Sequence, residues 1–412
     1  MKRIFIFFIC FLFANILLAQ TKDQYSIKVQ GIYGGILNHD PIHLGPLIKN
    51  AVKGAEISVE FQTMGEKSWH QYQNFPIIGV GTVWLNLGNP DKLGNAFALY
   101  PYISLPLWRT KFFHLNLKGG MGASLLNKTY YNTNSSGNYL TSLAGANAAI
   151  GSNLNIYFSG GGCLELPISK GFSATVEYTW NHISNGSAVA PNAGINMLNA
   201  FAGLKYSPNS RNSILPKRKE ISDIPRNLSV EIIASGGFRQ LYYQDNYLNF
   251  IPNNDPHFKT FPTASFIVAV FRPISNFYRM GVAMDAFYDG VYDGKNSPAW
   301  KRTYITSDAL KNKIRIGISW QNELMFGRMT AGFHFGLYLF NPLKNLEPYS
   351  NAQNGTLNKP LIYPYNINKE DGWLYTRAAL KYAVSEHYFI SLGLKTHLQK
   401  AEFIEWGLGY KF

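Results

Sequence analysis

The stretch Phe172-Ser-Ala-Thr-Val-Glu-Tyr-Thr-Trp-Asn-His-Ile-Ser-Asn-Gly186 alternates between apolar and polar side chains along most of its length. Such a period of two places successive side chains on opposite faces of a β-strand. We therefore predict a strand over 172–184 with one apolar and one polar face. His182 and Ser184 stand two residues apart at its end, on the face that carries Trp180. A base and a hydroxyl nucleophile thus share a surface that is otherwise apolar.

Similar alternation recurs along the chain, for example over 25–33, 57–62, 314–321 and 390–395. Segments of roughly 10 to 14 alternating residues match tilted membrane strands and exceed the usual strand of about 5 or 6 residues. The composition agrees, because aromatic residues make up 15% of the chain, charged residues only 15%, and there are 37 glycines. We predict an all-β fold, a transmembrane antiparallel β-barrel with its apolar face towards lipid, rather than a soluble β-sandwich.

The expected connections alternate in length, as they do in outer-membrane barrels. Long connections are expected at 38–54, 127–146, 292–312 and 341–371, and tight ones at 168–171, 274–276, 326–328 and 385–387. The chain ends on an alternating strand, Ile404-Glu-Trp-Gly-Leu-Gly-Tyr-Lys-Phe412, which resembles the C-terminal signal that the barrel-assembly machinery reads. We therefore expect an integral protein of the cell outer membrane of a Gram-negative bacterium.

Four regions follow from this pattern. Residues 1–20 read as a signal peptide, because Lys2 and Arg3 precede an apolar run that closes with Leu-Ala-Gln. Residues 21–207 and 227–412 each hold about eight expected strands, and 208–226 form a basic linker rich in proline. The halves are either two tandem eight-stranded units or parts of one barrel of about 16 strands, and the linker favours tandem units.

Charge and cysteine content narrow the partners. The formal net charge of +14 favours anionic partners such as lipid phosphates, and the scattered basic residues of an exported chain argue against nucleic acid. Cys163 is the only thiol after the signal, so neither an intrachain disulfide nor a cysteine-based metal site is expected. His39, Asp40 and His43 are expected to be loop residues, because Pro41 prevents a helical metal-ligand spacing, although a role in binding phosphate or a cation stays open. No cofactor and no metal are expected.

The run from His182 to Asn196 resembles the outer-membrane lipid A 3-O-deacylase family, PagL, also described as acyloxyacyl hydrolases. The family pattern is a His-x-Ser-Asn strand end, a short loop with Pro-Asn, and then Gly-Ile and an acidic residue that opens the last strand of an eight-stranded barrel. His182-Ile-Ser-Asn185, Pro191-Asn192 and Gly194-Ile195 match this pattern. The resemblance is specific over 172–206, extends over 24–207, and is not found in the second half.

The resemblance implies a serine esterase, a carboxylic ester hydrolase that removes an ester-linked acyl chain from lipid A of lipopolysaccharide. Ser184 would be the nucleophile and His182 its general base. Asn196 stands where the family has its triad glutamate, so it can orient the histidine but offers no negative charge.

Three further residues are candidates for binding the substrate and the oxyanion. A backbone N–H near Gly186, together with the side-chain amide of Asn185 or Asn192, would supply the donors. The same residues are also ordinary turn formers. The alternative function is therefore a non-catalytic outer-membrane barrel, a porin-like or adhesin scaffold whose deacylase site has decayed with the loss of its acid.

Three expectations concern placement. With the N-terminus in the periplasm, the strand from Phe172 is about the seventh and its end reaches the outer rim of the membrane. Five aromatic residues are expected in a girdle at the lipid interface rather than in a sugar-stacking site: Trp69, Tyr72, Tyr100, Tyr102 and Trp108. His397 is expected to echo His182 in a second, duplicated half that lacks the serine.

Overall fold

The computed structural model describes residues 25–41, 44–133, 146–208, 215, 217, 219, 223–240, 260–292, 309–341, 372–397 and 400–412. The expected signal peptide and most of the expected linker lie outside these ranges. Among the helices of the described ranges, none has both the length and the apolar character needed to cross a membrane.

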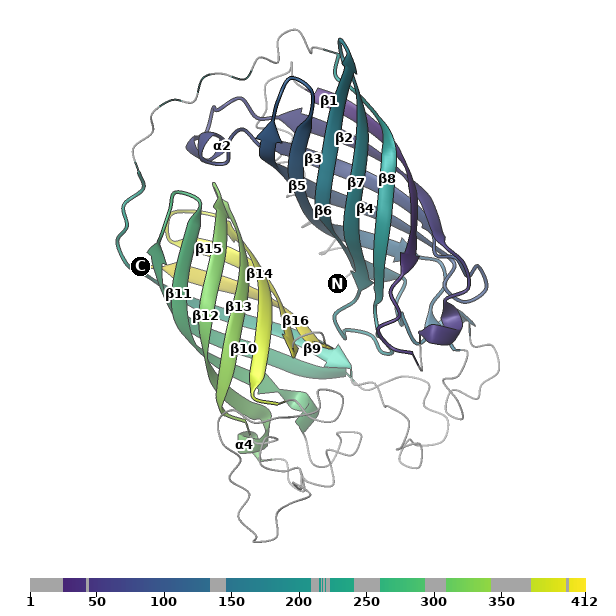
Figure 1. Ribbon diagram of the computed structural model, residues 1–412. Coiled ribbons are helices and arrows are strands. Elements are labelled where there is room, and N and C mark those ends of the chain that lie inside the picture. The colour runs from purple at the N-terminus through teal and green to yellow at the C-terminus, as the bar shows by residue number, and fades with distance from the viewer. Residues whose placement is uncertain are drawn as a thin grey trace, which may run out of the picture. The chain divides into compact units, whose positions relative to one another are not determined.

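The first half of the chain forms a closed antiparallel barrel of eight strands (Figure 1). Each strand pairs with its neighbour in sequence, and the first pairs with the eighth, so that Ile27 lies opposite Tyr206 and Ile36 opposite Met197. The strands are β1 (Tyr25–Ile36), β2 (Val52–Gln62), β3 (Ile77–Asn86), β4 (Asn95–Arg109), β5 (His114–Leu126), β6 (Leu154–Ser169), β7 (Phe172–Ser184) and β8 (Ile195–Tyr206). Short helices lie in three connections: η1 (Gly45–Leu47), α2 (Ser68–Tyr72) and α3 (Tyr130–Thr133).

The second half forms its own closed barrel of eight strands, in which β16 pairs back onto β9 (Figure 1). The strands are β9 (Ser229–Gln240), β10 (Thr260–Pro273), β11 (Tyr278–Asp289), β12 (Ile314–Phe326), β13 (Met329–Phe340), β14 (Leu374–Ala383), β15 (Tyr388–His397) and β16 (Lys400–Lys411). The short helices η4 (Gly290–Tyr292) and α4 (Leu310–Lys313) lie between β11 and β12. The predicted fold class is confirmed, in the form of two tandem barrels.

Alternating side chains face opposite sides of each barrel wall. In β1, Ile27 and Val29 are exposed on the outer face, whereas Lys28 and Gln30 are buried in the interior. The interior of a barrel with eight strands is just wide enough to be filled by side chains. In the first barrel it holds ion pairs, since Glu177 contacts both Lys28 and Lys118, the latter at 2.9 Å. The polar face predicted from the sequence is therefore the inner face.

Tyr100 and Tyr102 lie inside the first barrel, which corrects the expected girdle. Both are buried, and their hydroxyl groups donate hydrogen bonds to Glu56 (2.6 Å) and Glu60 (2.7 Å). The reason is the register of β4, in which the even-numbered residues from Ala96 to Ser104 face inwards while Phe97 and Leu99 are exposed on the outer face. A tyrosine suits an interior with carboxylates because its ring fills volume and its hydroxyl satisfies an acceptor.

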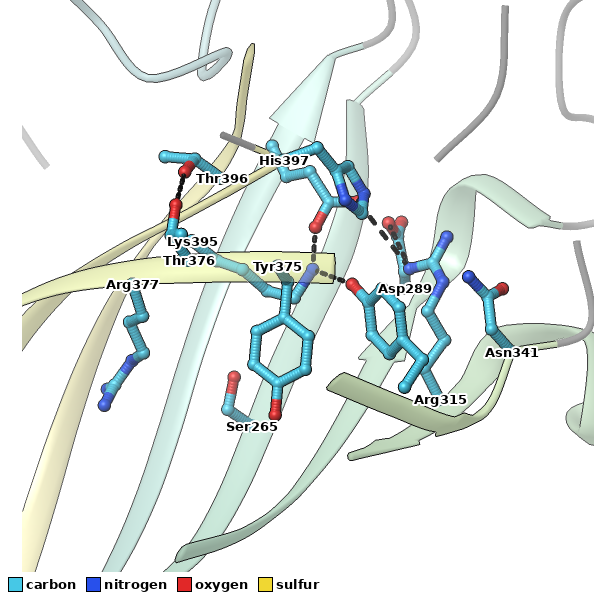
Figure 2. A network of polar contacts seen from close by, with 12 residues as sticks. Ser265, Asp289, Arg315, Asn341, Tyr375, Thr376, Arg377, Lys395, Thr396 and His397 are labelled. Atoms are coloured by element: carbon cyan, nitrogen blue, oxygen red, sulfur yellow. Dashed lines mark hydrogen bonds and ion pairs between the residues drawn. The ribbon is translucent and has the colours of Figure 1, made fainter. Parts of the chain in front are cut away.

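The second barrel also carries a polar network in its interior (Figure 2). Lys395 donates a hydrogen bond to the Tyr338 hydroxyl (2.5 Å) and pairs with Glu402. His397 Nε2 lies 2.8 Å from a carboxylate oxygen of the same Glu402. His397 is thus an interior residue of β15, and the expected echo of His182 is wrong, because the two histidines occupy opposite faces of their barrel walls.

Candidate functional site

The predicted strand over 172–184 coincides with β7, the seventh strand of the first barrel. Asn181 and Ile183 are fully buried and face the interior, so His182 projects to the outer side between them. Ser184 ends the strand and is only 7% exposed. The loop 185–194 then leads into β8, which runs back along β7.

His182 and Asn196 lie directly opposite each other across β7 and β8. The distance from His182 Nδ1 to the Asn196 carboxamide oxygen is 2.6 Å. A carboxamide oxygen accepts but cannot donate, so this contact is a hydrogen bond when Nδ1 carries the hydrogen, and in the neutral ring Nε2 then keeps its lone pair. This is the tautomer that a general base needs in order to take the proton of a serine hydroxyl. The prediction that Asn196 lies on the outer face beside His182 therefore agrees with the geometry.

Two neighbours hold the His182 ring in place. Trp180 stacks on it with the ring centroids 5.6 Å apart and the planes inclined by 16°. On the loop, a methyl group added at Gly194 would lie 2.9 Å from His182 Cε1, and Gly194 has a φ of +77°. Glycine is required at this position both by the backbone and by the ring that packs against it.

Asn192 connects the loop to the serine. Its amide nitrogen donates to Ser184 Oγ (2.9 Å), and its amide oxygen accepts from the Asn185 backbone N–H (3.1 Å). The Asn185 side chain instead donates to Ser152 Oγ (2.8 Å). Asn192 is accordingly the side-chain amide beside the nucleophile, and Asn185 supports the loop.

Gly186 follows in the left-handed region with a φ of +61°. Backbone of this kind favours glycine, so the residue turns the chain directly after Asn185. The assignment of Asn185, Gly186 and Asn192 as oxyanion donors stays a prediction.

The connection between β5 and β6 makes hydrogen bonds to the loop 185–194. The Ala193 N–H donates to Ala148 O (3.2 Å) and the Gly194 N–H donates to Ala149 O (2.9 Å). Both contacts, like that of Ser152 with Asn185, join the connection between β5 and β6 to the loop between β7 and β8. Sequence analysis missed them because the contacts depend on which loops meet at the same end of the barrel.

His39 also reaches the site. Its Nδ1 lies 3.2 Å from the Asn196 amide nitrogen, and its Nε2 lies 3.1 Å from Ala193 O. His39 was expected to be a loop residue, which it is, and its neighbour His43 lies outside the described ranges. Within those ranges, no group of three or more His, Cys, Asp or Glu is placed to hold a metal ion.

Two family models match the chain. The model described as lipid A 3-O-deacylase (PagL) matches residues 53–205. The model described as acyloxyacyl hydrolase, C-terminal domain, matches residues 228–350 and 361–412. The second match corrects the expectation that the resemblance ends with the first half, because it shows that the second barrel resembles the C-terminal domain of acyloxyacyl hydrolases.

Solved structures with low sequence identity also match. The crystal structure of the outer membrane enzyme PagL is 16% identical, with 43% of this chain and 98% of that chain covered and a TM-score of 0.27. A de novo designed transmembrane β-barrel is 10% identical over 46% of this chain and 98% of that chain, with a TM-score of 0.23. The siderophore receptor PirA from Acinetobacter baumannii is 9% identical over 95% and 81%, with a TM-score of 0.23.

No curated protein matches the chain. The first model covers the first barrel from β2 to β8 and leaves out β1, and the second model covers all eight strands of the second barrel. The first model includes His182, Ser184 and Asn196, the residues whose geometry is described above. The first barrel therefore resembles the lipid A 3-O-deacylase (PagL) family over residues 53–205, and the second barrel resembles the acyloxyacyl hydrolase C-terminal domain over residues 228–350 and 361–412.

Proposed function

We propose that the first barrel is an outer-membrane serine esterase that removes an ester-linked acyl chain from lipid A. The observation that carries the proposal is the hydrogen bond from His182 Nδ1 to Asn196, which leaves Nε2 as a base on the side of the strand where Ser184 follows. A serine hydroxyl needs such a base, because it is a weak nucleophile at its own pKa.

The reaction follows from these positions. Ser184 Oγ attacks the ester carbonyl while His182 Nε2 takes the hydroxyl proton, and the carbonyl oxygen becomes an oxyanion. The Asn192 amide and a backbone N–H near Gly186 stabilise that charge. The tetrahedral intermediate collapses, the sugar oxygen leaves with the proton from His182, and the acyl group stays on Ser184. Water, activated by the same histidine, then releases the fatty acid.

The acyl chain is bound on the outside of the barrel wall. Trp180 and Phe158, whose rings lie 5.4 Å apart, occupy the outer face next to His182. The interior is filled by charged pairs such as Lys118 and Glu177, which an acyl chain could not displace without leaving buried charges unpaired. An apolar chain entering from the lipid phase meets only the outer face.

Strand direction supports access to lipopolysaccharide. If the N-terminus lies in the periplasm, odd-numbered strands run outwards, and the end of β7 lies at the outer rim of the membrane. The outer leaflet there presents the ester-linked acyl chains of lipid A. Integration in the outer membrane would require the barrel-assembly machinery and surrounding lipid as partners.

The alternative is a scaffold without activity, and one observation favours it: Asn196 supplies no negative charge to stabilise the imidazolium that forms on His182. The esterase would change the lipid A of cells that express the chain, whereas the scaffold would leave it unchanged.

The test is mass spectrometry of lipid A from cells that express the full chain or its variants. Wild type should remove one acyl chain, and Ser184→Ala and His182→Ala should each abolish the loss, because residues that act as a unit fail together. Ser169→Ala is the matched control and should behave as wild type, because Ser169 ends β6 and pairs with Phe172 at the start of β7, at the other end of that strand from Ser184. Identical profiles for wild type and Ser184→Ala would refute the esterase and leave the scaffold.

A further inference from the structure

Closure of the first barrel brings the end of β1 next to the start of β8. Ile36 pairs with Met197, and the Leu37 N–H donates to Asn196 O at 2.8 Å. His39 follows two residues later, and its ring lies beside the Asn196 carboxamide. This residue precedes the range 53–205 that matches the family model, so nothing in that match assigns it a role.

The Asn196 carboxamide is shared between two histidines. Its oxygen lies 2.6 Å from His182 Nδ1, and its nitrogen lies 3.2 Å from His39 Nδ1. For the amide to donate to His39, Nδ1 of that ring must offer a lone pair, and its hydrogen must be on Nε2. His39 Nε2 lies 3.1 Å from Ala193 O, where a hydrogen has an acceptor. In the series of contacts from His182 through Asn196 and His39 to Ala193 O, each donor therefore faces an acceptor.

The orientation of Asn196 decides the protonation of His182. If the carboxamide turned over, its nitrogen would donate to His182 Nδ1, and the histidine hydrogen would move to Nε2. His182 would then have no lone pair for Ser184. A carboxylate has two equivalent oxygens and does not face this choice, so only an asparagine at this position needs a neighbour that fixes its orientation.

One contact works against this arrangement. Leu37 O lies 3.2 Å from His39 Nδ1, where it would favour a hydrogen on that nitrogen. Ala193 O makes the opposite demand at Nε2. With one carbonyl at each ring nitrogen, the amide hydrogen of Asn196 is the contact that favours the Nε2–H form.

We propose that His39 is a positioning residue of the esterase: by accepting a hydrogen bond from Asn196, it sets the carboxamide so that His182 keeps its base tautomer. The proposal rests on the proposed function for its meaning in catalysis. The tautomer of His182 is a property of the folded chain and is measured independently of any activity.

The kinetic test compares two variants of similar size in the full chain. His39→Leu removes the acceptor, whereas His39→Gln keeps an oxygen that can accept from Asn196. We expect His39→Leu to lower kcat about tenfold with little change in KM, the effect of one lost hydrogen bond, and His39→Gln to lose less. In an Asn196→Asp background, where no orientation has to be chosen, His39→Leu should change kcat by less than about twofold. An equal loss in both backgrounds would show a merely structural role and overturn the proposal.

The second measurement is nitrogen NMR of histidine-labelled full chain in detergent, with the His182 signals assigned from His182→Gln. Wild type should show the hydrogen on Nδ1 of His182, and His39→Leu should move a large share of it to Nε2. The same tautomer in both proteins would overturn the role of His39, whether or not the chain releases fatty acid. A changed tautomer in a chain that releases none would support the positioning and refute only the esterase.

Discussion

Replacing Asn196 by aspartate restores a negative charge with almost no change in shape. The side chain is partly exposed, and its oxygen already lies 2.6 Å from His182 Nδ1. In the transition state the histidine becomes a cation, and a carboxylate whose charge centre lies about 4 Å away attracts it by about 4 kcal/mol at an effective dielectric constant of about 20.

Only part of that attraction lowers the activation free energy relative to wild type. The neutral carboxamide already accepts a hydrogen bond worth about 1 kcal/mol, and a partly exposed pair is screened by solvent. A net stabilisation of about 1.4 to 2.7 kcal/mol corresponds to a rate increase of about 10- to 100-fold. Asn196→Glu, which introduces the residue of the family pattern, should also exceed wild type.

The assay is fatty acid release from lipid A by full-length protein in detergent, followed across pH so that plateau rates are compared. Asn38→Asp, on the exposed loop beside His39, controls for a general effect of added charge at this end of the barrel and should leave the rate unchanged. A plateau rate for Asn196→Asp equal to or below that of wild type would refute the reasoning, because it would mean that another group already supplies the counter-charge.

Three further predictions concern packing and assembly. Gly194→Ala should lower fatty acid release at least tenfold, because alanine is strained at this positive φ and its methyl group would push against His182 Cε1 and displace the base. Gly119→Ala is the control and should leave the release unchanged, because its added methyl group meets no atom within 4 Å. Glu177→Ala should lower the free energy of unfolding of the first barrel in urea by about 3 to 5 kcal/mol, because Lys28 and Lys118 lose a buried partner. If Glu177→Ala lowered this free energy by less than the outer-face change Val176→Ala, the result would contradict a stabilising role of the interior ion pairs. Deletion of 410–412 removes the pairing of Tyr410 with Ile232 and the hydrogen bond from the Phe412 N–H to Val230 O, so the truncated protein should lose heat-modifiable migration. Normal migration and normal levels in the membrane would contradict a role of these last residues in assembly.

The strands were predictable because each barrel wall separates lipid from a polar interior. That separation imposes the period of two seen in 172–184, and β7 has the predicted limits. The same constraint placed Asn196 on the outer face opposite His182 before any distance was known. Local sequence is sufficient for such features because they depend only on a strand and its nearest neighbour.

Features that depend on closure were not predictable. Lys28 and Glu177 are 149 residues apart in sequence, and no local pattern says that they meet inside the barrel. Tyr100 and Tyr102 were misplaced because an aromatic ring suits either a lipid interface or a packed interior, and only the carboxylates across the barrel decide. His39 was missed for a related reason, although one signal existed: in a closed barrel the end of the first strand must lie beside the start of the last.

The number of strands bears on the alternative to an esterase. Water-filled channels are found in barrels of about 16 strands or more, whereas eight strands leave an interior that side chains fill. Each barrel of this chain has eight, and their interiors hold ion pairs such as Lys118 with Glu177 and His397 with Glu402. If wild type and Ser184→Ala gave the same lipid A, a porin would therefore still be disfavoured. The remaining function would lie on the outer faces or in the loops, as expected of an adhesin scaffold.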